Sequence, residues 1–149
     1  MKKFLVFLCV ICMVLSTGTV AFATERYFEQ EPNNSRSTAD GPYTVKENEY
    51  HISIDGIVSE SDKVDWFKVR SEKRGGSAIV LRLRDEDVDY DIYLYDDRGR
   101  MLGSSELGKG EDERIYDIYI RPNETYYILV EHRYGIPKQA YRILFDVFE

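Results

Sequence analysis

Side chains that commonly carry catalysis are scarce in this chain of 149 residues. It contains two cysteines, Cys9 and Cys12, and two histidines, His51 and His132. Neither the H-E-x-x-H zinc motif nor the G-x-S-x-G nucleophile motif occurs in it. Carboxylate pairs are abundant and leave a glycosidase open, but one strand-rich domain of this size has little room for a deep cleft. We therefore expect no catalytic residue.

Positively charged residues are also fewer than negatively charged ones. The chain has 20 Lys and Arg against 27 Asp and Glu, a formal net charge of -7. Loss of a signal peptide would remove Lys2 and Lys3 and no acid, which makes the charge two units more negative still. Such a chain is a poor partner for nucleic acids or anionic membranes. It is well suited to a bound cation.

The first 23 residues have the pattern of a secretory signal peptide. A short basic start is followed by an apolar run over residues 4–15, which is shorter than the roughly 20 residues that span a bilayer. Residues 21–23 form an A-x-A cleavage site. We expect cleavage after Ala23 and secretion of a monomer. Both cysteines lie in this segment, so the mature chain must be held by its core, by a metal ion, or by both.

Beyond residue 23, no segment has the periodicity of an amphipathic helix. Residues 24–45 are polar and contain Pro32 and Pro42, which predicts an extended arm with turns. Residues 46–149 contain short segments in which apolar and polar residues alternate with a period of two, and turn residues separate these segments. This pattern predicts one all-β domain, an antiparallel β-sandwich of about eight strands. The expected strands lie near residues 50–58, 66–70, 78–84, 88–95, 101–102, 115–120, 126–131 and 141–148.

Two short segments predict a calcium site. Glu29, Glu31 and Asn33 occupy alternate positions, so their side chains share one face of an extended backbone. Asp62 and Asp65 lie three residues apart on a turn that precedes an apolar strand. If the segments meet, four carboxylates and one amide converge, and calcium favours 6–8 oxygen ligands of this kind. The alternative is that these residues only cap surface turns.

A second acidic run, with Asp87, Asp89 and Asp91 at alternate positions, resembles the start of an EF-hand loop. That loop requires Gly at its sixth position and Glu at its twelfth, where this chain has Ile92 and Arg98. The EF-hand interpretation therefore fails. A strand with acids on one face is the favoured interpretation, and a second weak calcium site is the minor one.

Aromatic side chains are the remaining feature of the predicted strands. The chain has 12 tyrosines and one tryptophan. Packing explains most of them, because tyrosine is a good strand former. Some must face water, and tyrosines on a sheet face can stack on sugars or grip a polypeptide. With Phe67 and Val69 pointing inward, Trp66 would lie with Lys68 and Arg70 on the opposite face as a partly covered platform.

Four motifs in order resemble the bacterial pre-peptidase C-terminal domain family, which includes the collagen-binding domains of clostridial collagenases. They are E-Q-E-P-N-N-S at 29–35, the segment G-I at 56–57 leading to D-K-V-D-W-F at 62–67, D-Y-D-I-Y-L-Y-D at 89–96, and E-T-Y-Y-I-L-V at 124–130. A final strand that contains Tyr141 follows. The resemblance covers nearly the whole mature chain.

The resemblance implies a jelly-roll-like β-sandwich in which calcium is held by the E-x-E-P-N arm and the D-x-x-D turn. Matched by position, the implied ligands are again Glu29, Glu31, Asn33, Asp62 and Asp65. The implied function is a secreted, non-catalytic module that binds an extracellular polymer, either a protein such as collagen or a polysaccharide. Such domains usually follow a peptidase, whereas this one follows a signal peptide. A partner, inhibitor or stabiliser of a separately encoded secreted peptidase is therefore the alternative.

Overall fold

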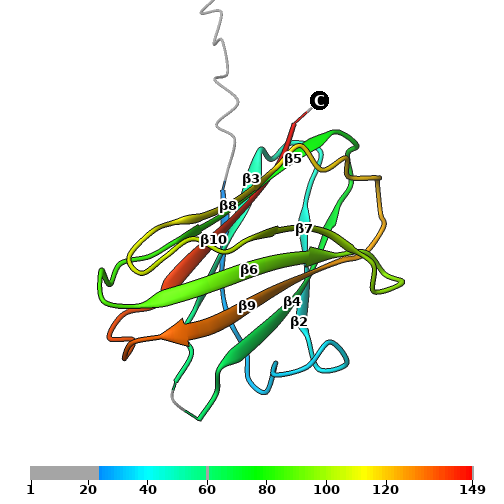
Figure 1. Ribbon diagram of the computed structural model, residues 1–149. Helices are drawn as coiled ribbons and strands as arrows, with labels where there is room; N and C mark the ends of the chain where they lie inside the picture. Colours follow the sequence, from blue (N-terminus) through cyan, green and yellow to red (C-terminus); the bar gives the residue numbers. More distant parts are fainter. Residues whose placement is uncertain (1–23, 60, 149) are drawn as a thin grey trace, which may run out of the picture.

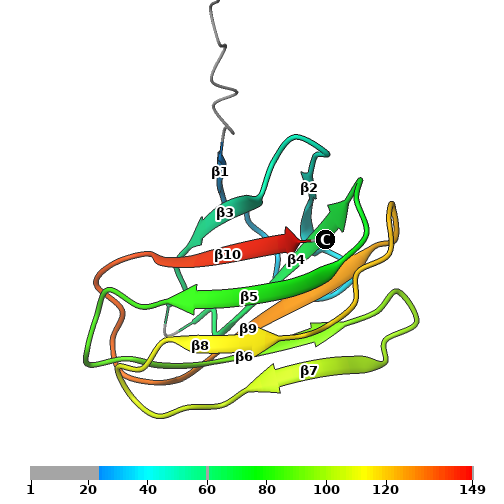
Figure 2. The same cartoon turned by 90° about the horizontal axis from the view of Figure 1, so that it is seen from above.

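The computed structural model describes residues 24–59 and 61–148, and the predicted signal peptide lies outside them. These residues form ten strands in two five-stranded sheets, which Figures 1 and 2 show packed against each other. One sheet has the order β1-β3-β10-β5-β8, and the other has the order β2-β4-β9-β6-β7. The strands are β1 (Glu25–Phe28), β2 (Asp40–Val45), β3 (His51–Gly56), β4 (Val64–Ser71), β5 (Gly76–Arg82), β6 (Asp89–Tyr95), β7 (Met101–Ser105), β8 (Glu113–Tyr116), β9 (Tyr126–Tyr134) and β10 (Tyr141–Phe148).

The core lies between the sheets and follows from the alternating sequence. Phe67 and Val69 of β4, Ile128 of β9 and Phe145 of β10 are fully buried, while their sequence neighbours face outward. Because alternate residues of a strand point to opposite faces, each strand gives one apolar face to this core. The prediction of an all-β sandwich is confirmed. In the part of the chain that the structure describes, no helix is long and apolar enough to cross a membrane.

Two of the ten strands were not predicted, and both come from the polar arm. The strand β1 pairs in parallel with β3, and β2 pairs in parallel with β4, so both sheets are mixed. The rings of Tyr27 and Tyr43 lie 4.4 Å apart and join these two edge strands across the open side of the sandwich. Short polar strands of this kind lack an apolar alternation that would reveal them in a sequence.

Two loops meet at one end of the sandwich, the lower end in Figure 1. Residues 29–39 connect β1 to β2 and so cross from one sheet to the other, and residues 57–63 connect β3 to β4 in the same way. The backbone N–H of Trp66 donates to the carbonyl of Asn33 at 2.9 Å, and that of Glu29 donates to the carbonyl of Asp55 at 3.0 Å. These bonds fix the arm against the β3–β4 connection and bring the two predicted ligand segments together.

Candidate metal centre

Three carboxylates converge where the two loops meet. One oxygen each of Glu29, Glu31 and Asp65 lies within 4.8 Å of the other two. Glu29 and Glu31 come from the loop after β1, and Asp65 is the second residue of β4. Glu31 is exposed, Glu29 is half-buried and Asp65 is fully buried, so the group forms a pocket of oxygen atoms that opens toward solvent at Glu31.

Backbone and side-chain donors hold the two inner carboxylates in place. The N–H of Ile57 donates to Oε1 of Glu29 at 2.5 Å, while Oε2 of Glu29 is buried and has no hydrogen-bond partner among the described residues. The hydroxyl of the buried Tyr141, on β10, donates to Oδ2 of Asp65. This contact of Tyr141 could not be predicted from the sequence, because Tyr141 lies 76 residues from Asp65 in the chain.

The glycine at position 56 leaves room for the site. A Cβ atom added there would lie 2.3 Å from the hydroxyl oxygen of Tyr141 and 2.7 Å from Oε2 of Glu29. Real Cβ atoms do not approach other heavy atoms so closely, and a crowded core responds to added atoms with strain. Gly56 is therefore a structural requirement of the site.

Asn33 faces the carboxylates with a fully buried side chain. In the amide orientation that satisfies its neighbours, Nδ2 donates to Oε2 of Glu31 at 3.1 Å and to Oδ1 of Asp65 at 3.2 Å. In the reverse orientation, the amide oxygen faces the same carboxylate oxygens. The amide can thus donate to the carboxylates, or it can offer its oxygen to a cation placed between them.

Asp62 lies at the rim of the group and outside the three converging carboxylates. It accepts a hydrogen bond from the amide of Asn34, and its own N–H donates to the backbone carbonyl of Ser59 at 3.2 Å. Burial raises the pKa of Glu31, and the hydrogen bond and charge of Asp62 raise it further. Of the five predicted ligands, the structure therefore brings Glu29, Glu31, Asn33 and Asp65 together and leaves Asp62 beside them.

The electrostatics of the group favour a bound cation. Burial, followed by the charge of Glu31, raises the pKa of Glu29 to about 7, and burial with the charge of Glu29 raises the pKa of Asp65 to about 8. Among residues 24–59 and 61–148, no Lys, Arg or His forms an ion pair with Glu29, Glu31 or Asp65. A hard cation would supply the missing counter-charge, and these oxygen donors suit calcium.

Comparison with solved structures gives 28 matching chains, of which two are described here. No family model and no curated protein matches this chain. The structure is similar to the pre-peptidase C-terminal domain of a collagenase from Bacillus anthracis, with 12% identity, a TM-score of 0.47, and coverage of 73% of this chain and 98% of that domain. It also matches a β-glucosidase from Paenibacillus barengoltzii with 12% identity and a TM-score of 0.35, over 83% of this chain and 13% of the glucosidase. The first match is to the domain type that the sequence motifs resemble.

Proposed function

We propose that this chain is a secreted, non-catalytic β-sandwich module that binds calcium at Glu29, Glu31, Asn33 and Asp65, with Asp62 at the rim, and that attaches to an extracellular polymer. The observation that carries the proposal is a group of three converging carboxylates, one exposed, one half-buried and one fully buried, with no cationic side chain among the described residues to neutralise them. The pattern of a signal peptide in residues 1–23 supports secretion.

The ligand chemistry favours calcium over other ions. The group offers carboxylate and amide oxygens and no imidazole or thiolate, which excludes the usual ligands of zinc and copper. Calcium accepts irregular shells of 6–8 oxygens, whereas magnesium demands a nearly ideal octahedron. Backbone carbonyls or water would complete the shell. Extracellular calcium modules often need dissociation constants of only about 10⁻⁴–10⁻³ M.

Calcium at this position would tie the β1–β2 loop to β4. Its ligands come from residues 29–33 of the loop and from Asp65 of β4, so the complete site exists only in the folded chain. An ion that binds the folded state alone stabilises it by mass action, by about 1.4 kcal/mol at a free concentration tenfold above the dissociation constant. For a domain of this size that corresponds to a rise in melting temperature of roughly 5 °C.

Thermal unfolding of the chain from residue 24 to 149 tests the metal site. We expect calcium at millimolar concentration to raise the melting temperature of the native chain by several degrees and a chelator to reverse the effect. Glu31→Gln should lose most of this response while it still folds, because Glu31 is exposed. Glu111→Gln, an exposed acid on the loop before β8, is the matched control and should keep the response. If calcium does not change the melting temperature of the native chain, the metal assignment is overturned.

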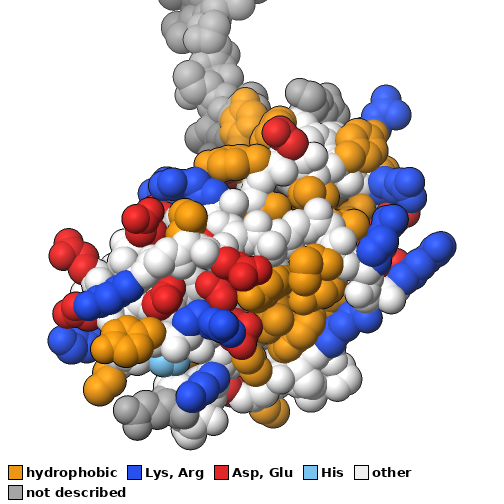
Figure 3. All heavy atoms as spheres, viewed as in Figure 1, with side chains coloured by type: hydrophobic (Ala, Val, Ile, Leu, Met, Phe, Trp, Pro, Cys, Tyr) orange, Lys and Arg blue, Asp and Glu red, His pale blue; other side chains and the backbone are white. Residues whose placement is uncertain are grey.

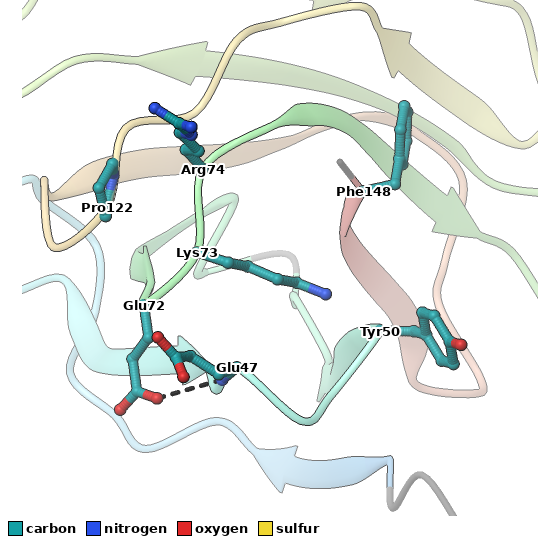
Figure 4. Close-up of a pocket in the computed structure, with 7 residues that line it drawn as sticks. All are labelled: Glu47, Tyr50, Glu72, Lys73, Arg74, Pro122 and Phe148. Carbon is teal, nitrogen blue, oxygen red and sulfur yellow. Dashed lines mark hydrogen bonds between the residues drawn. The ribbon is translucent and has the colours of Figure 1, made fainter.

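The surroundings of His132 and of a surface depression support a non-catalytic role. Both ring nitrogens of His132 are buried without a hydrogen-bond partner among the described residues. The ring of His51 lies 3.5 Å from the carboxylate of Asp146 and 3.3 Å from the hydroxyl of Thr24, at the start of the described chain. The depression in Figure 4 lies among turns, and two of its side chains bond to the backbone of these turns. There Glu72 accepts the N–H of Glu47 at 3.1 Å, and Lys73 donates to the carbonyl of Glu49 at 2.5 Å.

A further inference from the structure

The outer face of the sheet β2-β4-β9-β6-β7 carries a continuous group of aromatic side chains. Two neighbouring rows of outward-facing residues run across the strands. In the first row, Leu129 lies between Trp66 and Tyr93, and in the second row Tyr127 lies opposite Tyr95. All are partly exposed. Figure 3 shows hydrophobic side chains gathered over β4, β6 and β9 on this side of the molecule. We call this surface the aromatic face; its members are Trp66, Tyr93, Tyr95, Tyr127 and Leu129.

The aromatic face is wide enough for a chain molecule. Its rings come from three neighbouring strands, which together span about 10 Å. The rings of Trp66 and Tyr95 lie 5.4 Å apart with an angle of 35° between their planes. Aromatic faces carry partial negative charge and attract the polarised C–H groups of a sugar ring. A peptide, in contrast, is usually bound at a sheet edge or in a groove.

Cationic side chains border the aromatic face at one end. Lys68 lies opposite Tyr127 in the sheet, and Arg70 is the next outward-facing residue of β4. Arg36 reaches over from the β1–β2 loop, with its guanidinium carbon 4.4 Å from the centre of the Tyr127 ring. In the part of the chain that the structure describes, none of these three cations forms an ion pair. Arg70 donates to the hydroxyl of Thr125 at 2.8 Å, and Arg36 donates to backbone carbonyls.

The acids of the same sheet face lie at its other end, where two of them share one arginine. Asp91 and Glu131 face each other in the register, and Arg133 contacts both, at 3.1 and 2.9 Å. In a chain with a net charge of -7, three cations without acidic partners are therefore concentrated beside the exposed rings. A neutral ligand would cover these cations and leave their charge unmatched, at a cost in desolvation. An anionic ligand would match it.

We propose that the aromatic face binds an acidic polysaccharide, whose sugar rings stack on Trp66 and Tyr95 and whose carboxylates contact Lys68 and Arg70. This proposal rests on the polymer-binding role proposed above and names the chemical class of the polymer. Sugar rings use the aromatic surface, and carboxylates spaced along the chain use the row of cations. Both features are needed, because neither a neutral glycan nor a simple anion would satisfy the two together.

The position of Trp66 provides a direct measurement. It is the only tryptophan of the chain, so its fluorescence reports on the aromatic face alone. We expect soluble acidic glycans (hyaluronan, chondroitin and polyglucuronate as the probes) to change this emission in a saturable way, in calcium-containing buffer. Carboxyl-reduced hyaluronan and dextran should bind at least tenfold more weakly, and added salt should weaken the binding of the acidic glycans.

Paired variants separate the aromatic face from charge in general. The double variant Lys68→Gln with Arg70→Gln should lower the affinity for the acidic glycans at least tenfold. The control Arg84→Gln with Lys138→Gln changes the net charge equally at exposed positions that form no ion pair in the described residues, and it should leave the affinity within twofold. The melting temperature of each variant verifies that it folds.

Each outcome of these titrations supports or overturns a specific part of the proposal. Equal binding of hyaluronan and its carboxyl-reduced form, or binding of gelatin alone, would overturn the acidic polysaccharide and leave the polymer-binding role standing. Glycan binding that both double variants weaken equally would overturn the aromatic face as the site. If no acidic glycan, neutral glycan or gelatin binds, the polymer-binding role fails together with this proposal, while the calcium assignment depends on its own unfolding experiment.

Discussion

The guanidinium carbon of Arg36 lies 4.4 Å from the centre of the Tyr127 ring, and this contact joins the two surfaces proposed above. Arg36 lies three residues after Asn33 in the loop that supplies most of the proposed calcium ligands. Its side chain also donates to the carbonyls of Asp96 and Asp97 in the β6–β7 turn. The same short loop thus contacts the carboxylate group at one point and the aromatic face at another.

The first prediction is that calcium and polymer binding are coupled through this loop. Calcium should hold residues 29–33 in place and so keep Arg36 over Tyr127, which orders the aromatic face before the polymer arrives. Removal of calcium should weaken glycan binding several-fold, and Arg36→Ala should reduce the difference between the two conditions. Arg98→Ala, an exposed arginine on the β6–β7 turn, is the control. Glycan affinity that is the same with calcium and with chelator would contradict this coupling.

A second prediction concerns the hydroxyl of Tyr141, which donates to the fully buried Asp65. Tyr141→Phe removes this donor and leaves a buried carboxylate oxygen without its partner, at a cost of about 1–3 kcal/mol in the free energy of unfolding. Tyr90→Phe is the matched control, because the buried hydroxyl of Tyr90 has no hydrogen-bond partner in residues 24–59 and 61–148. Its removal should leave stability unchanged or improve it. Denaturant unfolding measures the free energy of unfolding of the two variants. Equal losses in this free energy would show that the Tyr141 hydroxyl contributes no more to stability than the Tyr90 hydroxyl.

A third prediction follows from the contacts around Gly56. In Gly56→Ala the new methyl group would collide with the Tyr141 hydroxyl and with Glu29, so one of the two must move. We expect a loss of about 1–3 kcal/mol in stability and a weaker calcium response, since the moved groups belong to the site. Gly108→Ala has open space around it and should retain both properties. If calcium raised the melting temperature of Gly56→Ala as much as that of the native chain, this result would contradict the assigned geometry.

The sequence predicted the candidate site better than it predicted its surroundings. Glu29 and Glu31 were recognised because alternate positions of an extended segment share a face, a rule that depends only on backbone geometry. Asp62 and Asp65 are both close to them, but the sequence has no means of ranking two acids on one turn. Burial distinguishes them, because Asp65 enters β4 and faces the core while Asp62 stays at the rim.

What the sequence could not predict depends on contacts between distant segments. The strands β1 and β2 are short and polar, and they exist because the exposed edges of β3 and β4 accept them in parallel. The contact from Tyr141 to Asp65 crosses between the two sheets. The core strands, by contrast, show their pattern locally, since an apolar residue at every second position is enough to predict them.

The last prediction is a dependence of calcium-free stability on pH. The pKa of Glu29 is raised to about 7 and that of Asp65 to about 8, mainly by burial, so the folded chain holds these protons more tightly than the unfolded chain does. Stability from this source is fully present below pH 4, where both carboxyls are protonated even in the unfolded chain. It is lost as the pH rises through the folded values of about 7 and about 8.

Melting temperatures measured across this range in calcium-free buffer should therefore fall as the pH rises from 5 to 8. Saturating calcium should remove most of the fall, because the bound ion replaces the protons as counter-charge for the ionised carboxylates. Glu29→Gln should flatten the calcium-free profile, since an amide at position 29 does not ionise and no longer opposes the ionisation of Asp65.

Asp55 provides an internal contrast. Burial acts to raise its pKa, but Arg142 and Arg26 lower it overall, so its contribution is lost only as the pH falls below about 4. A calcium-free melting temperature that rises between pH 5 and pH 8 would contradict the buried carboxylate pair as the source of the effect.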